Sequence, residues 1–239
     1  DHIQGEAAYA GAAYRLQLSR AEWQSAAYVE MVGPMLRRLA GAVTRTDEEP
    51  AVVVLQTPGN HSRVGSKGEC DPHSSWERTL FADLRQSLAD MPSIAWVEPR
   101  GKRQGLVHPL SGLRVVMAHG DRNIRVNYTG SPTPMTWPSF EASARHLGMN
   151  GWDIGLAGHR HVPAYVGGEQ SVFSNGSFCG ATDLAVDAAL KPTPACQWFL
   201  GVCAEGLCWT QNLVLSWPTS TTVDELGVVR GDIQEGAAS

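Results

Sequence analysis

The apolar positions of this chain have helical spacing in some segments and form continuous runs in others. Between residues 14 and 40, apolar side chains recur at steps of three and four, which is the spacing of a helix with one buried face. We expect one long helix there, with Pro34 as the point at which it would kink. Shorter helices are expected at residues 76–88 and 140–147.

Short apolar runs without alternation predict strands that are covered on both faces. Such strands are expected at residues 51–55, 94–97, 113–118 and 152–157. Strands of this kind that alternate with helices are typical of an α/β protein. From residue 164 to 217 the pattern changes to strands separated by glycine turns, which we expect to form a meander that completes a second sheet. Residues 219–239 are expected to form a weakly held tail, which leaves residues 1–218 as one domain.

Three of the apolar strands run directly into loops that carry histidine. Asn60 and His61 follow the first strand, His119 follows the second, and His159 and His161 follow the third. Ligands bind at the carboxyl ends of strands in sheets that are covered on both faces. Amide and imidazole side chains suit borderline divalent ions such as manganese, iron, nickel or zinc. On an extended backbone His159 and His161 would point the same way, into one site or astride two metals.

Composition and charge limit the classes of function. The 239 residues, 43% of them hydrophobic and 18% charged, describe a globular protein and exclude a fibre or a disordered tail. A net charge of −5 gives no positive field for holding nucleic acid, so an anionic substrate must be bound locally, by metal or a few cations. No apolar run approaches the roughly 18 residues of a membrane helix, and no export leader is visible. We expect a soluble, cytoplasmic protein that contacts no membrane.

The cysteines indicate a reducing compartment. There are five of them, an odd number, and they lack the paired spacing of a zinc clip. We interpret them as structural thiols.

The ordered motifs Gly59-Asn60-His61, His119-Gly120-Asp121 and Gly158-His159-Arg160-His161 carry a family resemblance. The set resembles the calcineurin-like metallophosphoesterases, whose motifs run Asp-x-His, Gly-Asp, Gly-Asn-His, a lone His and Gly-His-x-His. It is most similar to the versions carried by bacteriophages and prophages, which have a basic residue just after Gly-Asn-His, here Arg63. The resemblance reaches about Leu215. It implies a four-layer α/β/β/α fold, in which a two-sheet β-sandwich is flanked by helices. If the chain is phage-encoded, the protein would be located in the host cytoplasm.

The resemblance also implies a set of metal ligands. One metal would be held by Asn60, His119 and His159 together with Asp1, which falls on the bridging aspartate of the Gly-Asp motif. His161 would reach for a second metal. The first motif, a strand that ends in Asp-x-His, is not in this sequence, so we expect the N-terminal strands of the fold to be missing. A separate chain or segment would then supply that motif.

Two other segments contain the letters of the missing motifs. Asp71-Pro72-His73 reads Asp-x-His, but it lies in a loop with no strand before it. Gly231-Asp232 reads Gly-Asp and would fit a circular permutation, but no Asp-x-His accompanies it. Both are interpreted as chance matches.

By the same resemblance the reaction is hydrolysis of a phosphodiester. Divalent ions would lower the pKa of a bound water to give hydroxide for in-line attack, and His61 would protonate the leaving alkoxide as general acid. Arg63 and Lys67 either clamp a substrate phosphate or are ordinary solvated loop cations. Asp121 either orients a neighbouring histidine or caps the turn that follows.

The sequence restricts the substrate less than it restricts the type of reaction. A short single strand, a DNA end or a small phosphoester all fit an acidic chain, and Trp137 either stacks on a base or simply packs. The competing hypothesis is a catalytically incomplete or split relative that acts as a binding or structural subunit. A decayed site should lose its histidines in no particular order, and all of them are present. That favours an enzyme, with manganese as the first candidate among the ions.

Overall fold

The computed structural model describes residues 20–43, 50–62, 75–98, 101–109, 111–121, 136–178, 194–215, 221–223 and 229–231. Within them the chain is a mixed α/β protein with parallel and mixed sheets. Its helices are α1 (Ala21–Ala42), α2 (Trp76–Ser87) and α3 (Thr136–His146). Its strands are β1 (Val52–Leu55), β2 (Ile94–Val97), β3 (Arg103–Val107), β4 (Arg114–Ala118), β5 (Ile154–Ala157), β6 (Ala164–Val166), β7 (Ser171–Ser174), β8 (Cys196–Cys203), β9 (Gly206–Val214), β10 (Thr221–Val223) and β11 (Val229–Gly231).

The strands of the described residues pair into one large sheet and three two-stranded ones. The large sheet has the order β3-β4-β5-β7-β6, in which β4, β5 and β7 run parallel and the two edge strands run antiparallel to their neighbours. β1 and β2 form a parallel pair, whereas β8–β9 and β10–β11 form antiparallel pairs. Because β4, β5 and β7 are parallel, their carboxyl ends meet at one edge of the large sheet.

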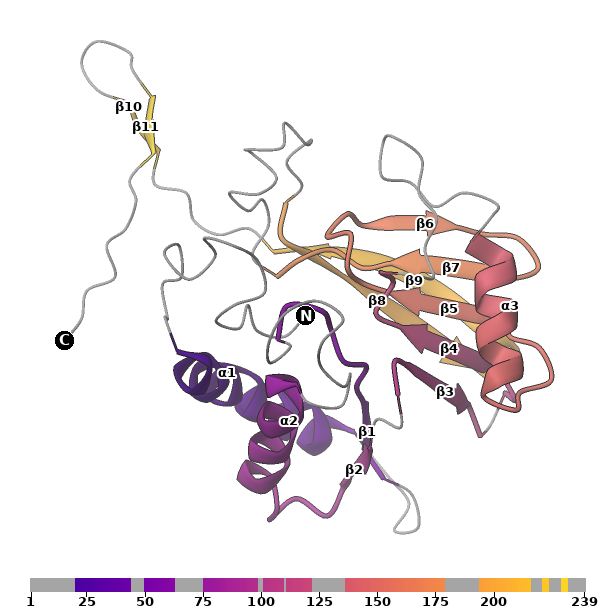
Figure 1. The fold of residues 1–239 in the computed structure, drawn as a ribbon, viewed down its shortest axis with the longest axis horizontal. Coiled ribbons are helices and arrows are strands. Elements are labelled where there is room, and N and C mark those ends of the chain that lie inside the picture. The colour runs from indigo at the N-terminus through magenta and orange to yellow at the C-terminus, as the bar shows by residue number, and fades with distance from the viewer. Residues whose placement is uncertain are drawn as a thin grey trace.

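The helices α1 and α2 lie side by side over the β1–β2 pair (Figure 1). Leu36 of α1, Leu84 of α2 and Leu88, which caps the end of α2, form a buried cluster with Ile94 of β2. The helix α2 begins at a cap, since the Ser75 hydroxyl accepts a hydrogen bond from the backbone N–H of Glu77 at 3.1 Å. In the part of the chain that the structure describes, no helix is both long and apolar enough to cross a bilayer.

The large sheet is covered on both faces, as the continuous apolar runs predict. Successive residues of β7 point to opposite faces. Val172 packs into a core cluster with Phe140 of α3, which lies across one face of the sheet (Figure 1). Phe173 packs edge-on against Trp198 of β8, with ring centroids 5.4 Å apart. The β8–β9 hairpin therefore covers the face that α3 leaves open.

An ion pair aligns β4 with β5 at their amino ends. The Arg114 guanidinium donates to both carboxylate oxygens of Asp153, at 3.0 and 2.6 Å, and the Arg114 backbone N–H donates to the same group at 2.7 Å. These bonds hold the pKa of the Asp153 carboxyl below its usual range. The register that results places Ala118 opposite Ala157, so the loops after both strands start level.

The helices and buried strands lie close to their predicted positions, and the differences concern weaker patterns. The strand β2 has the predicted bounds, and α1 contains Pro34 well inside the helix. β3 was not predicted, because its first residue, Arg103, ends the basic stretch 100–103, which is typical of a turn. The predicted meander is wrong in one respect, because β8 and β9 pair with each other and with no strand of the large sheet. Two short strands, β10 and β11, pair within the predicted tail.

The interpretation of all the cysteines as thiols is corrected at the β8–β9 turn. Cys203 and Cys208 form a disulfide that closes this hairpin. Cys196 is a buried free thiol, whose pKa is raised by burial. Cys70 and Cys179 lie outside the described residues.

The contact of α3 with β5 predicts a steric constraint at Gly155. A Cβ atom there would lie 2.9 Å from two ring atoms of the fully buried Phe140. We expect Gly155→Ala to lower the free energy of unfolding by about 1–3 kcal/mol through overpacking, measured by urea denaturation. The matched control is Gly41→Ala in α1, where a Cβ meets nothing within 4 Å and should leave stability equal or slightly higher. Equal denaturation midpoints for wild type and Gly155→Ala would contradict this packing.

Candidate metal centre

Three of the predicted ligands meet at the carboxyl ends of their strands. Asn60 follows β1, His119 follows β4, and His159 follows β5. Asn60 Oδ1 lies 2.7 Å from His119 Nε2 and 2.9 Å from His159 Nδ1, and the two ring nitrogens lie 3.0 Å apart. One amide oxygen and two imidazole nitrogens thus form a triangle of mutually touching polar atoms.

Hydrogen bonds cannot account for all three sides of this triangle. The oxygen carries no proton, and each of the two ring nitrogens carries at most one. Whatever the tautomers, at least one contact sets two lone pairs or two N–H groups against each other. A bound cation would accept all three lone pairs, so the donor set fits a metal ion.

The loop after β5 is strained at both of its histidines. His159 and His161 have φ angles of 65° and 56°, in the left-handed backbone region that residues other than glycine rarely adopt. The backbone here is not extended, so the condition under which the two imidazoles would point the same way is not met. Backbone strain of this kind persists where the surroundings enforce it and is concentrated at functional sites.

Close approach of two loops sets His119 beside His159. The Gly158 backbone N–H donates to the His119 carbonyl at 3.0 Å. Gly120 has a φ of 107°, and a Cβ atom there would lie 3.1 Å from the Gly158 carbonyl oxygen. Glycine at position 120 is thus needed both for the backbone angle and for the contact between the loops.

Burial keeps the imidazoles uncharged at neutral pH. It lowers the pKa of His119 to about 2, with the nearby His159 adding to the effect. It also lowers the pKa of His159 to about 4, with the charge of Arg160 as the next cause. Burial lowers the pKa of His161 as well. Because metals bind the deprotonated imidazole, His119 and His159 are in the binding form at pH 7.

The other predicted site residues have different outcomes. His61 lies near the triangle, since its charge contributes to the lowered pKa of both triangle histidines and of His161. Asp121 is also near, because its charge acts to raise the pKa of His159. Asp1, Arg63 and Lys67 lie outside the described residues, as do Asp71-Pro72-His73 and Asp232. Among the described residues no three His, Cys, Asp or Glu side chains converge, so the triangle depends on its amide.

Sequence reasoning missed Glu77 of α2. Its side chain is buried, and it accepts a hydrogen bond from the backbone N–H of Gly59, next to Asn60. The signal was a polar residue at a core position, because Glu77 shares the helical spacing of the buried Leu80 and Leu84. Trp137, by contrast, packs against the core cluster under α3.

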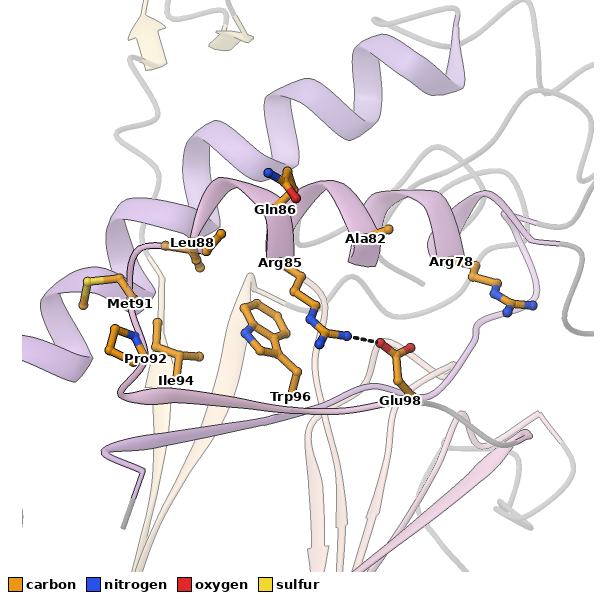
Figure 2. Close-up of a pocket in the computed structure, with 11 residues that line it drawn as sticks. Arg78, Ala82, Arg85, Gln86, Leu88, Met91, Pro92, Ile94, Trp96 and Glu98 are labelled. Atoms are coloured by element: carbon orange, nitrogen blue, oxygen red, sulfur yellow. Dashed lines mark hydrogen bonds and ion pairs between the residues drawn. The ribbon is translucent and has the colours of Figure 1, made fainter. Parts of the chain in front are cut away.

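A surface pocket of about 440 Å³ lies elsewhere, between α2 and β2. Arg85 and Glu98 form an exposed ion pair at 2.7 Å beside Trp96 in this pocket (Figure 2). None of the residues that line it belongs to the histidine site. An exposed pair of this kind contributes little to stability.

The chain matches no protein-family model and no curated protein. Among solved structures it resembles Vps29 of Chaetomium thermophilum, with 14% identity over 62% of this chain and 69% of the other, at a TM-score of 0.32. It also resembles a conserved uncharacterised protein of Streptococcus pneumoniae TIGR4, described as a predicted phosphoesterase. That match has 14% identity over 78% of this chain and 91% of the other, at a TM-score of 0.33. Function is therefore inferred from the site itself.

The lowered histidine pKa values predict the pH dependence of stability. On unfolding, each histidine returns to a pKa of about 6.5, so the unfolded state binds more protons than the folded state below that pH. Stability of the metal-free protein is then fully present above pH 6.5. It falls as the pH drops toward about 4 for His159 and about 2 for His119. Each histidine contributes up to about 1.4 kcal/mol per pH unit within its window.

Urea denaturation in EDTA at pH values from 5 to 8 measures this slope. His159→Gln should reduce it, whereas His146→Gln, at an exposed position at the end of α3, should keep the wild-type slope. Equal slopes for wild type and His159→Gln would contradict a half-buried, neutral His159.

Proposed function

We propose that this chain is a metal-dependent phosphoesterase of the metallophosphoesterase type that hydrolyses a phosphodiester. The observation that supports it is the triangle of Asn60 Oδ1, His119 Nε2 and His159 Nδ1, which fits a divalent cation and no arrangement of protons. Manganese is the first candidate among the borderline divalent ions that amide and imidazole ligands suit. Such an ion, when bound, lowers the pKa of a water ligand and holds phosphoryl oxygens.

The chain's own residues have separate tasks in this proposal. Asn60, His119 and His159 hold the ion, and the buried ring of His119 excludes bulk water from one side of it. His61, the neighbour of Asn60, donates a proton to the leaving alkoxide, which is the task of a general acid that titrates near neutral pH. Arg63 and Lys67, on the same stretch of chain, bind the substrate phosphate.

The proposal also includes a second metal ion. His161 and Asp1 would contribute to it, together with an Asp-x-His motif supplied by another segment or chain. In the complete site the four-layer arrangement of the resembled family would bring these groups to the same strand ends. A short single strand, a DNA end or a small phosphodiester is the proposed substrate, because the net charge of −5 disfavours a long duplex.

The test combines metal content with the choice of leaving group. Manganese bound per chain is measured by elemental analysis, and hydrolysis is compared for bis(4-nitrophenyl) phosphate and a thymidine dinucleotide. His61→Ala should keep the metal and lower the rate on the dinucleotide about 10²–10⁴-fold. The loss should be smaller on the aryl ester, because nitrophenolate leaves without a proton. Asn60→Ala should bind manganese more weakly and lose activity, and His146→Ala is the control.

Other outcomes would exclude the proposal or narrow it. A wild-type chain that binds no manganese and hydrolyses neither substrate contradicts it. Bound metal without turnover on either substrate would favour the alternative of a binding or structural subunit. Equal losses on both substrates would show that His61 does not protonate the leaving group.

A further inference from the structure

We propose that Glu77 is a positioning residue, whose buried carboxylate holds the Gly59–Asn60 segment so that Asn60 Oδ1 stays against His119 and His159. This rests on the proposed function in one respect, since it takes Asn60 as a metal ligand. The contact between Glu77 and the loop is a feature of the protein without metal, and it can be tested by itself.

Glu77 is in an unusual position for a carboxylate. Glu77 is 1% exposed, and it lies on the face of α2 where Leu80 and Leu84 pack into the core. A buried charge is costly unless hydrogen bonds compensate it. One carboxylate oxygen of Glu77 accepts from the backbone N–H of Gly59, in a short bond. Charge-assisted bonds of this type are among the stronger ones in proteins. The helix thus fixes the residue that directly precedes Asn60.

The same turn of α2 fixes the other end of the loop. The Trp76 backbone N–H donates to the Ser62 carbonyl at 2.9 Å, and the hydroxyls of Ser62 and Ser75 lie 3.0 Å apart. Ser62 is fully buried. Gly59 and Ser62 are therefore both anchored to the start of α2, and the two residues between them are Asn60 and His61. This arrangement gives the functional pair little freedom to move away from the helix.

A buried chain of hydrogen bonds links this unit to the large sheet. The Gln104 side chain of β3 donates to the Gln56 carbonyl at 3.0 Å, and the Gln56 side chain donates to the Glu77 carbonyl at 3.4 Å. All three residues are buried. His119 and His159 follow strands of the large sheet, whereas Asn60 follows β1. These bonds therefore help to set the distance between Asn60 and the two histidines.

The charge of Glu77 also acts on the site. It opposes the lowering of the pKa of His119, so it lies within electrostatic range of that ring. A negative charge at this range would attract a cation bound by His119. Glu77→Gln removes the charge and keeps the shape, so its effect does not arise from a cavity.

The experiment compares Glu77→Gln with Glu98→Gln, the same change at an exposed residue of an ion pair. Hydrogen exchange of the Gly59 amide is measured on the metal-free proteins, and the affinity for Mn²⁺ is measured by titration. We expect Glu77→Gln to speed Gly59 exchange at least tenfold and to weaken Mn²⁺ binding about 10–100-fold. Glu98→Gln should change both by less than twofold. Should Glu77→Gln fail to fold, Ser62→Ala weakens the second anchor and should shift both readouts in the same direction.

A double-mutant cycle separates positioning from a general loss of stability. If Glu77 acts through Asn60, its effect on Mn²⁺ affinity should vanish in an Asn60→Ala background. A full and additive effect in that background, or unchanged Gly59 exchange in Glu77→Gln, overturns the proposal. A wild-type chain that binds no Mn²⁺ would contradict the proposed function, and Gly59 exchange would still decide the role of Glu77.

Discussion

The contact of one amide oxygen with two imidazole nitrogens is the constraint around which the site is organised. Asn60 comes from the strand pair under α1 and α2, whereas His119 and His159 come from the large sheet. The triangle can close only when these two parts of the fold are held at a fixed distance. It also brings together atoms that protons alone cannot pair, so the protein without metal holds an unfavourable arrangement that a divalent cation would relieve.

Several features of the fold stabilise that arrangement. The parallel register of β4 and β5 starts both histidine loops level, and glycine at position 120 lets the loops touch. The left-handed backbone at His159 is held by this contact, because the N–H of the preceding Gly158 is bonded to His119. On the other side, the first turn of α2 holds the residues on either side of Asn60 and His61. The strained backbone at His159 and the buried carboxylate of Glu77 below the Asn60 loop both lower the stability of the fold. Destabilising features of this kind are concentrated at functional sites.

The sequence predicted the parts of this site that depend on continuous apolar runs. Such runs located β1, β4 and β5, and the polar residues that follow them are the ones that meet. It missed β3, because that strand begins with the polar residues Arg103 and Gln104. The side chain of Gln104 is nevertheless buried, where it donates to the Gln56 carbonyl. The left-handed backbone at His159 could not be predicted, because a tertiary contact there overrides local preference. Glu77 was overlooked because a carboxylate in a helix is normally a solvated residue, and only its place among buried leucines sets it apart.

The central claim is that Asn60, His119 and His159 hold one divalent ion. Pulsed electron paramagnetic resonance of the Mn²⁺-loaded protein tests it directly, because imidazole nitrogens bonded to the ion modulate the echo. The account predicts modulation from two nitrogens in the wild type, from one in His119→Ala and in His159→Ala, and from two at lower occupancy in Asn60→Ala. Mn²⁺ that shows no nitrogen modulation, or modulation that both histidine variants leave unchanged, would contradict it.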